Sequence, residues 1–362
     1  MRKLLQIAVT LFFALCAALL CQWMHTPIPW MLGPLLVTAA GSLSGLPTRS
    51  ANSLRNGGQW IIGTTLGLYF TPQVGALVVS LWWAIGVGIV WALALGFLFG
   101  AWLHRQHASL LTQGESAHCA QEARATSYFS GAIGGAAEMT LLAERAGART
   151  DLVAAAHSLR LLLVVVLLPF GMTWFQLHWD LHVDTMLLPG PRVAQWPGLL
   201  YLALASGAGA WLMTRFKRAN PWFIGAMLAS IMLTLSGQHW SAVPTELSNA
   251  AQLVIGVSLG VRFEKKFVHT APRWMVSVML GTLVMMFASA AMGWAMAWAT
   301  GLNPATLILG TAPGGIAEMA ITAKVLELGV PVVTAFQVCR LVAVLLLVAP
   351  MYKWFQSPAA SP

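Results

Sequence analysis

The sequence predicts an all-helical membrane protein that crosses the bilayer many times and consists of two copies of one helical unit. Three observations predict this fold class: an apolar composition, a series of long apolar segments, and motifs that occur twice. Of the 362 residues, 58% are hydrophobic and 9% are charged, whereas soluble domains average about 45–50% apolar and about 25% charged residues. With a mean hydropathy of +0.74, most of the surface must face lipid rather than water.

Several motifs recur in the same order in both parts of the chain. Pro-Trp-x-x-Gly begins at residues 29 and 221, and Gln-x-x-Ile-Gly-x-x-Leu-Gly-x-x-Phe spans 59–70 and 252–263. Gly-Gly-x-Ala-Glu-Met then spans 134–139 and 314–319, and Arg-Leu follows at 160–161 and 340–341. A colinear series of matches indicates an internal duplication. We therefore expect a first membrane repeat over 1–175, a periplasmic linker over 176–196 and a second membrane repeat over 197–362.

The second motif contains Gly-x-x-x-Gly in each half, at 63–67 and at 256–260. Small residues four positions apart share one face of a helix and allow a second helix to approach closely in lipid. We interpret these glycines as packing positions.

Each half contains five apolar runs close to the roughly 17–25 residues that cross a bilayer. They lie near 4–24, 27–44, 57–72, 75–102 and 151–175, and near 197–214, 220–237, 247–263, 274–300 and 330–352. The first run follows Met1-Arg2-Lys3 without a small-residue cleavage site, which favours a retained membrane anchor over a signal peptide. One further segment per half, 126–145 and 303–328, is interrupted by glycine.

The basic residues indicate how these further segments lie. If each is a re-entrant hairpin that does not cross, 16 of the 20 Lys and Arg residues fall on the cytoplasmic side, as the positive-inside rule requires. If each segment crosses the membrane instead, the clusters of basic residues at 215–218 and 262–273 lie on the outside, against the positive-inside rule. Five crossings per half give the halves opposite orientations, with both termini cytoplasmic in a bacterial inner membrane. Inverted repeats with broken helices are typical of secondary transporters.

Two carboxylates, Glu138 and Glu318, each follow a glycine pair at membrane depth in this arrangement. An ionised side chain there costs about 2.5–3.5 kcal/mol on insertion scales and requires a partner or water. Glycine supplies backbone conformations that a residue with a Cβ atom resists, so we expect backbone breaks at both pairs. The helices that follow would direct their N-termini at the breaks and attract anions. We expect the two carboxylates to bind protons or sodium.

Two arginines, Arg160 and Arg340, lie in otherwise aliphatic runs. They either hold a substrate carboxylate by bidentate hydrogen bonds or form structural ion pairs with Glu138 and Glu318, because buried charges are usually paired. The candidate substrate- or ion-binding residues are Gly134, Gly135, Glu138, Arg160, Gly314, Gly315, Glu318 and Arg340.

Other functional classes find little support. The residues His104, His107, Glu115, His118, Cys119 and Glu122 match no common zinc spacing, and we interpret them as a solvated loop. The sequence contains no nucleophile elbow, phosphate loop or catalytic triad spacing, so we expect no enzyme, metal or cofactor. The net charge of +9 is spread thinly rather than gathered on a nucleic-acid-binding element. The expected partners are the lipid bilayer and a small-molecule or ion ligand, and a homodimer is compatible with the sequence.

A duplicated membrane unit with Pro-Trp-x-x-Gly openings and Gly-Gly hairpins resembles the AbrB family of bacterial inner-membrane proteins over nearly the whole chain. That family's hairpins often read Ser-Pro-Gly-Gly. Here 312–315 read Ala-Pro-Gly-Gly, whereas 132–135 read Ala-Ile-Gly-Gly and depart from the proline. The small soluble DNA-binding regulator that shares the family's name is not similar to this sequence.

The resemblance implies a relation to cation–proton antiporters and anion transporters. Family members have been labelled regulators of gene expression or ammonia monooxygenases. The sequence does not support the monooxygenase label, because it has no cluster of metal-ligand residues near any predicted span. We therefore expect a transporter-like protein that moves a small anionic metabolite with H⁺ or Na⁺. The alternative is a membrane-embedded regulator of gene expression that acts through ligand sensing or effector transport.

Overall fold

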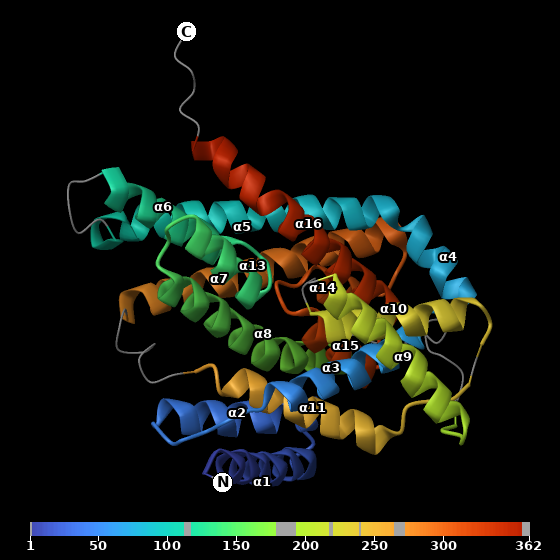
Figure 1. Ribbon diagram of the computed structural model, residues 1–362. Helices are drawn as coiled ribbons and strands as arrows, with labels where there is room; N and C mark the ends of the chain where they lie inside the picture. The colour runs from blue at the N-terminus through green and yellow to red at the C-terminus, as the bar shows by residue number, and fades with distance from the viewer. Residues whose placement is uncertain are drawn as a thin grey trace.

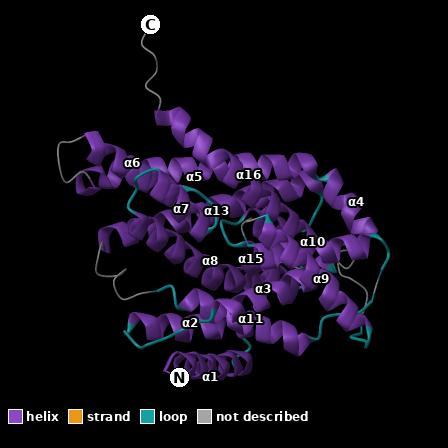
Figure 2. Cartoon of the chain, viewed as in Figure 1, coloured by secondary structure: helices purple, strands orange, loops and turns teal. Residues whose placement is uncertain are grey.

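The structure is a computed structural model that describes residues 2–111, 117–178, 193–216, 220–238, 240–263 and 272–356. Within these ranges every regular element is a helix, as Figure 2 shows. The helices of the first half are α1 (Arg2–Trp23), α2 (Pro29–Leu43), α3 (Asn52–Gly67), α4 (Pro72–Ser80), α5 (Trp82–Leu111), α6 (Ala117–Gly131), α7 (Ala136–Arg145) and α8 (Thr150–His178). Those of the second half are α9 (Gly198–Arg215), α10 (Pro221–Leu235), α11 (Thr245–Gly260), α13 (Pro272–Thr300), α14 (Pro304–Thr311), α15 (Ile316–Val325) and α16 (Val330–Gln356).

Three pairs of helices at corresponding places in the two halves have the same lengths. Both α2 and α10 have 15 residues, both α3 and α11 have 16, and both α7 and α15 have 10. The helices α2, α4, α10 and α14 begin with proline, whose missing N–H has no partner at a helix start in any case. Corresponding motifs of the sequence therefore form corresponding helices.

Five of the described helices are long and apolar enough to cross a membrane: α1, α5, α8, α13 and α16. Large apolar side chains on them are exposed, for example Phe12, Val90 and Phe287, which is expected where the surrounding solvent is lipid. The ends of these helices carry exposed tryptophans, including Trp82 and Trp298, as at membrane interfaces. These are the features of a polytopic helical membrane protein.

One predicted boundary is wrong. The apolar run 75–102 is not one helix, because α4 ends at Ser80 and α5 begins at Trp82. The short helix α4 instead meets α3 at an angle of 90°, and together they pass the same length and hydropathy test as a broken span or re-entrant loop. Thr71 begins the separate helix, because its side chain accepts a hydrogen bond from the amide of Val74.

The helices form two groups (Figure 1). In the panel group each helix packs on the next in the order α1, α2, α11, α3, α10 and α9. The bundle group comprises α5, α6, α7, α8, α13, α14, α15 and α16, which pack mainly on one another. Since α2 packs on α11 and α3 on α10, each half of the chain supplies a panel helix that packs on the other half.

The Gly-x-x-x-Gly glycines lie at these two contacts. A Cβ atom at Gly67 of α3 would lie 2.6 Å from the carbonyl oxygen of Met227 on α10. One at Gly260 of α11 would lie 2.8 Å from the carbonyl oxygen of Leu35 on α2. Any larger residue would have to separate the helices, so the interpretation of both motifs as packing positions is confirmed.

Candidate functional site

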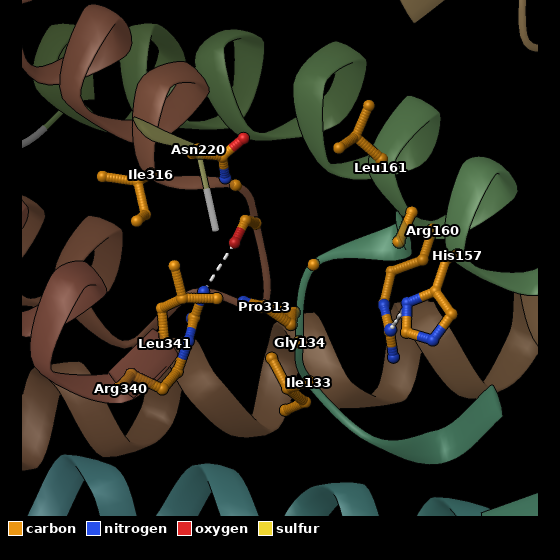
Figure 3. A pocket seen from close by; sticks show the side chains of 14 residues that line it. Ile133, Gly134, His157, Arg160, Leu161, Asn220, Pro313, Ile316, Arg340 and Leu341 are labelled. Carbon is orange, nitrogen blue, oxygen red and sulfur yellow. Dashed lines mark hydrogen bonds between the residues drawn. The ribbon is translucent and has the colours of Figure 1, made fainter. Parts of the chain in front are cut away.

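The helical path is interrupted at both glycine pairs. Residues 132–135 separate α6 from α7, and residues 312–315 separate α14 from α15. Gly134 and Gly314 line the same small cavity of about 70 Å³. Figure 3 shows the two interrupted segments on facing sides of this small cavity. The two breaks therefore lie next to each other, although they are 180 positions apart in the sequence.

The break glycines provide space rather than an unusual backbone conformation. Gly135 has φ −66° and Gly315 has φ −82°, and none of the four glycines has a positive φ. A Cβ atom on Gly135 would overlap a carboxylate oxygen of Glu138, and one on Gly315 would overlap Glu318. The expectation that glycine is needed for its backbone freedom is therefore wrong here. Glycine leaves space for the carboxylate, which would have to shift if a Cβ atom were present.

Both carboxylates lie at helix N-termini. Gly135 and Gly315 are the N-caps of α7 and α15, which places Glu138 and Glu318 at the third helical position. A glutamate at this position commonly reaches back to the N-cap backbone, and its negative charge at a helix N-terminus is worth about 0.3–1 kcal/mol. Glu318 is buried, with 7% of its surface exposed, whereas Glu138 is half-buried.

Arg160 and Arg340 bind backbone carbonyl oxygens at the two breaks. Arg160 donates to Gly131 O at 3.2 Å and Ala132 O at 2.7 Å. Arg340 donates to Ala312 O at 2.5 Å and Gly314 O at 2.6 Å. These carbonyls lie at the C-terminal ends of α6 and α14, where the helix dipole is negative. Each guanidinium group therefore neutralises a helix end that the break would otherwise leave without partners.

A polar residue three positions earlier orients each arginine. Arg160 donates to Nδ1 of His157, and because a guanidinium group can only donate, Nδ1 must accept. The neutral His157 ring therefore carries its proton on Nε2, which donates to Phe129 O at 2.9 Å. In the second half Gln337 accepts from Arg340 at 2.6 Å and donates to three carbonyl oxygens of the segment 309–312.

The alternative of structural Glu–Arg pairs is wrong. Among the described residues, no ion pair joins Glu138 to Arg160 or Glu318 to Arg340. The arginines form their hydrogen bonds with the C-terminal ends of the first broken helices, and the glutamates lie at the N-termini of the second. All four side chains therefore lie at the breaks, in two separate arrangements.

A larger cavity of about 440 Å³ lies beside the small one, and we call it the polar cavity. Both glutamates line it, together with Gly135, Gly315 and the first residues of α7 and α15. Helices α3, α10 and α11 of the panel group, with residues that flank α10 and α11, supply the rest of the wall except for Leu161 of α8. The polar residues that they add are Arg55, Asn56, Gln59, Asn220, Ser258 and Arg262. The polar cavity therefore lies between the panel group and the broken helices.

The sequence reasoning missed these panel residues. The positive-inside rule places Arg55 and Arg262 on the cytoplasmic side, and the repeated motif that contains Gln59 indicates only helix packing. Asn220 directly precedes the second Pro-Trp motif, and it lines both cavities. Its backbone is left-handed with φ 46°, which asparagine tolerates better than most residues. An asparagine directly before the Pro-Trp motif was therefore the sequence signal that could have indicated this lining residue.

The predicted solvated loop is largely helical. His104 and His107 lie on α5, and Cys119 and Glu122 lie on α6, while the structure of Glu115 and the side chain of His118 lie outside the described residues. His107 is buried, and its Nε2 lies 2.8 Å from the hydroxyl of Ser277 on α13. It contributes to helix packing rather than to a solvated surface.

Comparison with known proteins places the chain in a family. The family model described as "Transition state regulatory protein AbrB" matches residues 30–356. The chain belongs to the AbrB family. "Uncharacterized protein YhjN" of Bacillus subtilis (strain 168) is 26% identical over 355 residues, covering 90% of this chain and 87% of that protein. "Putative regulator AbrB" of Escherichia coli (strain K12) is 24% identical over 333 residues, covering 89% and 88% of the two chains. This AbrB-family match includes both glycine breaks and every residue of the polar cavity.

Proposed function

We propose that this AbrB-family protein is a secondary transporter that moves a small anionic metabolite together with H⁺ or Na⁺. One observation carries the proposal: broken helices at corresponding places of the two halves meet beside a cavity lined by charged side chains. In lipid, broken backbone is tolerated only where protein or a water-filled cavity covers it. Transporters place their substrate and ion sites at such breaks.

The proposal includes a membrane arrangement. The chain consists of two inverted repeats of five transmembrane helices, each with a re-entrant broken segment, in the bacterial inner membrane with both termini cytoplasmic. The equal lengths of three pairs of corresponding helices and the distribution of basic residues support this arrangement. A 16-residue helix such as α3 is about 24 Å long, shorter than a hydrocarbon core of about 30 Å. Such helices suit the interior of the panel, where α3 and α11 pack on each other.

In this proposal the anion and the coupling cation bind to different groups at the broken helices. The N-termini of α7 and α15 and the basic residues of the polar cavity attract the anion, while Glu138 and Glu318 exchange the coupling cation. Arg160 and Arg340 act as positioning residues, because their guanidinium groups are already bonded to the break carbonyls. The polar cavity lies between two helix groups, so displacement of one group against the other would change access to it. The proposal assigns the chain no catalytic reaction and no nucleic-acid contact.

The test is cation flux across a membrane. The purified protein is reconstituted in vesicles that contain a pH-sensitive or a sodium-sensitive dye, and small organic anions are added outside. We expect the wild type to carry cations inward with at least one anion, and the double variant Glu138→Gln/Glu318→Gln to carry none. Glu144→Gln, at an exposed position of α7, is the matched control and should behave as the wild type. Equal flux in vesicles with wild type and double variant would contradict the proposal.

A regulator of gene expression is the second candidate, because the family description and the name of the Escherichia coli relative both refer to regulation. The two candidates can be separated by transcript profiling of a deletion strain. If regulation depends on transport of an effector, wild-type protein should restore the profile and the double glutamate variant should not. Restoration by both would favour regulation that is independent of transport.

A further inference from the structure

Two arginines of the polar cavity lack a partner. Arg55 lies near the start of α3, and Arg262 follows the end of α11. Among the described residues neither side chain has a hydrogen bond or an ion pair within 4 Å, and the Nε atom of Arg55 is buried without a partner. The charges of the two arginines repel each other across the cavity, whereas the charges of Glu318 and Glu138 attract Arg262 when these glutamates are ionised. The two cations are therefore favourable only when negative charge lies near them, on the glutamates or on a bound anion.

Two helix N-termini add to this attraction. Residues 135–137 at the N-terminus of α7 and residues 315–317 at the N-terminus of α15 line the polar cavity. The leading amide groups of a helix have no carbonyl partner within it, and the helix dipole is positive at that end. Four positive features from four segments of the chain therefore surround one space of about 440 Å³. That volume lies within the range of roughly 300–1,000 Å³ typical of small-molecule sites.

The glutamates determine when this space attracts an anion. Arg55 and Arg262 carry two positive charges, and Glu138 and Glu318 carry two negative charges when ionised, so the lining is then neutral. When both glutamates hold a proton, the lining carries two positive charges. A dianion restores neutrality in the second state only.

Other charged groups near the glutamates are already bonded. Arg160 with His157 on α8 and Arg340 on α16 line the small cavity and bind backbone carbonyl oxygens. Lys324 of α15 donates to the hydroxyl of Ser248 at 2.9 Å. The arginines of the polar cavity are therefore the groups that a bound anion would contact.

We propose that the polar cavity binds a small dicarboxylate, with one carboxylate on Arg55 and the other on Arg262, while Glu138 and Glu318 each hold a proton. The geometry favours a dicarboxylate over phosphate or sulfate because one cation lies on α3 and the other follows the end of α11, and each guanidinium group matches one planar carboxylate. Two protons and one dianion make the occupied cavity neutral. This inference rests on the proposed transport function and names its substrate class.

The first test is ligand-dependent thermal stability of the purified full-length protein at constant ionic strength between pH 5 and pH 8. The probes are dicarboxylates from malonate to adipate, monocarboxylates of matching length, and sulfate. We expect at least one dicarboxylate to raise the melting temperature more than any monocarboxylate or sulfate, with an affinity for the dianion that falls as pH rises because binding takes up protons in this proposal. Arg55→Gln and Arg262→Gln should each weaken that affinity at least tenfold. Arg105→Gln, at an exposed position of α5, is the control.

The second test uses Glu138→Gln/Glu318→Gln, which keeps the lining in its uncharged-glutamate form. This variant should bind the dicarboxylate with an affinity, calculated from the concentration of the dianion, that no longer depends on pH. Equal binding of monocarboxylates, or dicarboxylate binding that both arginine variants retain, would overturn the inference and leave cation-coupled transport standing. Dicarboxylate binding that depends on both arginines, in a protein that carries no cation flux, would support the site and contradict the transport proposal.

Discussion

The guanidinium groups of Arg160 and Arg340 serve as permanent cations at the ends of two broken helices. Transporters often bind sodium through carbonyl oxygens freed by a broken helix. Here Ala132 O and Gly314 O, at the two breaks, accept hydrogen bonds from arginines of the same chain. These two carbonyl oxygens are therefore already bonded, and the transport proposal places the coupling cation on the carboxylates at the opposite ends of the breaks.

Replacement of Arg340 should destabilise the fold. Arg340→Met removes both hydrogen bonds to the break and leaves Gly314 O without its partner, at a cost of about 2–5 kcal/mol for the lost charged hydrogen bonds. Arg340→Lys keeps the charge but loses the planar fork, so its loss should be smaller. The free energy of unfolding by denaturant in mixed micelles measures both. Arg145→Met, at an exposed position of α7, should change it by less than about 0.5 kcal/mol.

The glutamates should behave in the opposite way. Glu138→Gln and Glu318→Gln each leave a side chain that also suits the third position of a helix, and within the described part of the chain no ion pair within 4 Å joins either glutamate to an arginine. Expression and melting temperature should therefore remain close to those of the wild type while coupled flux is lost. If the two variants instead fail to accumulate in the membrane, the carboxylates are structural and the assigned site is wrong.

The sequence predicts many of the residues that line the small cavity, but it does not predict the panel residues that line the polar cavity. The glycines, glutamates and arginines of the breaks stood out because each recurs at the same offset in both halves. Arg55 and Arg262 do not recur, since the corresponding positions of the matched motifs hold Ser248 and Tyr69. The positive-inside rule treats every basic residue as facing solvent. Arg55 and Arg262 line the polar cavity because of the way α3, α10 and α11 pack.

The panel helices depend on glycine at their crossing contacts. A Cβ atom at Gly63 of α3 would overlap the carbonyl oxygen of Phe223 on α10, whereas one at Gly57 of the same helix meets nothing within 4 Å. Gly63→Ala should therefore lower the melting temperature, because backbone cannot move aside as a flexible side chain can. Gly57→Ala should be neutral or stabilising, since alanine favours a helix by up to about 1 kcal/mol. Equal melting temperatures for the two variants would show that α3 and α10 do not approach this closely.

Hydropathy and the duplication predicted the order of the long helices along the chain. They did not predict the short helices. The turn between α3 and α4 lies inside an apolar stretch, so hydropathy alone gives no boundary there. The proline at the start of α4 and the preceding threonine cap were the local signals. The histidine-containing segment is polar, and a polar composition is typical of loops. Composition therefore does not reveal that α5 and α6 extend into this segment.

The opposite orientation of the halves can be tested on the whole molecule. In a background without Cys16, Cys21, Cys119 and Cys339, single cysteines are introduced at Thr185 and at Lys265, both outside the described residues. A membrane-impermeant thiol reagent added to intact cells should modify the first and spare the second, because the linker is periplasmic and the basic cluster cytoplasmic in this arrangement. Modification of position 265 from outside would rule out the inverted repeats.

The crossing contacts of the panel also constrain how the protein is made. Gly63 of α3 meets Phe223 of α10, and a ribosome that adds about 5–20 residues per second needs about 10–30 s to synthesise the chain between them. During that interval the glycine-lined face of α3 is in the bilayer without its partner. Assembly of the panel must therefore wait until most of the chain has been translated, and a shortened product cannot complete it. Segments 1–175 and 197–355 expressed separately should be degraded, and their co-expression should restore both to the membrane, as immunoblotting of membrane fractions would show.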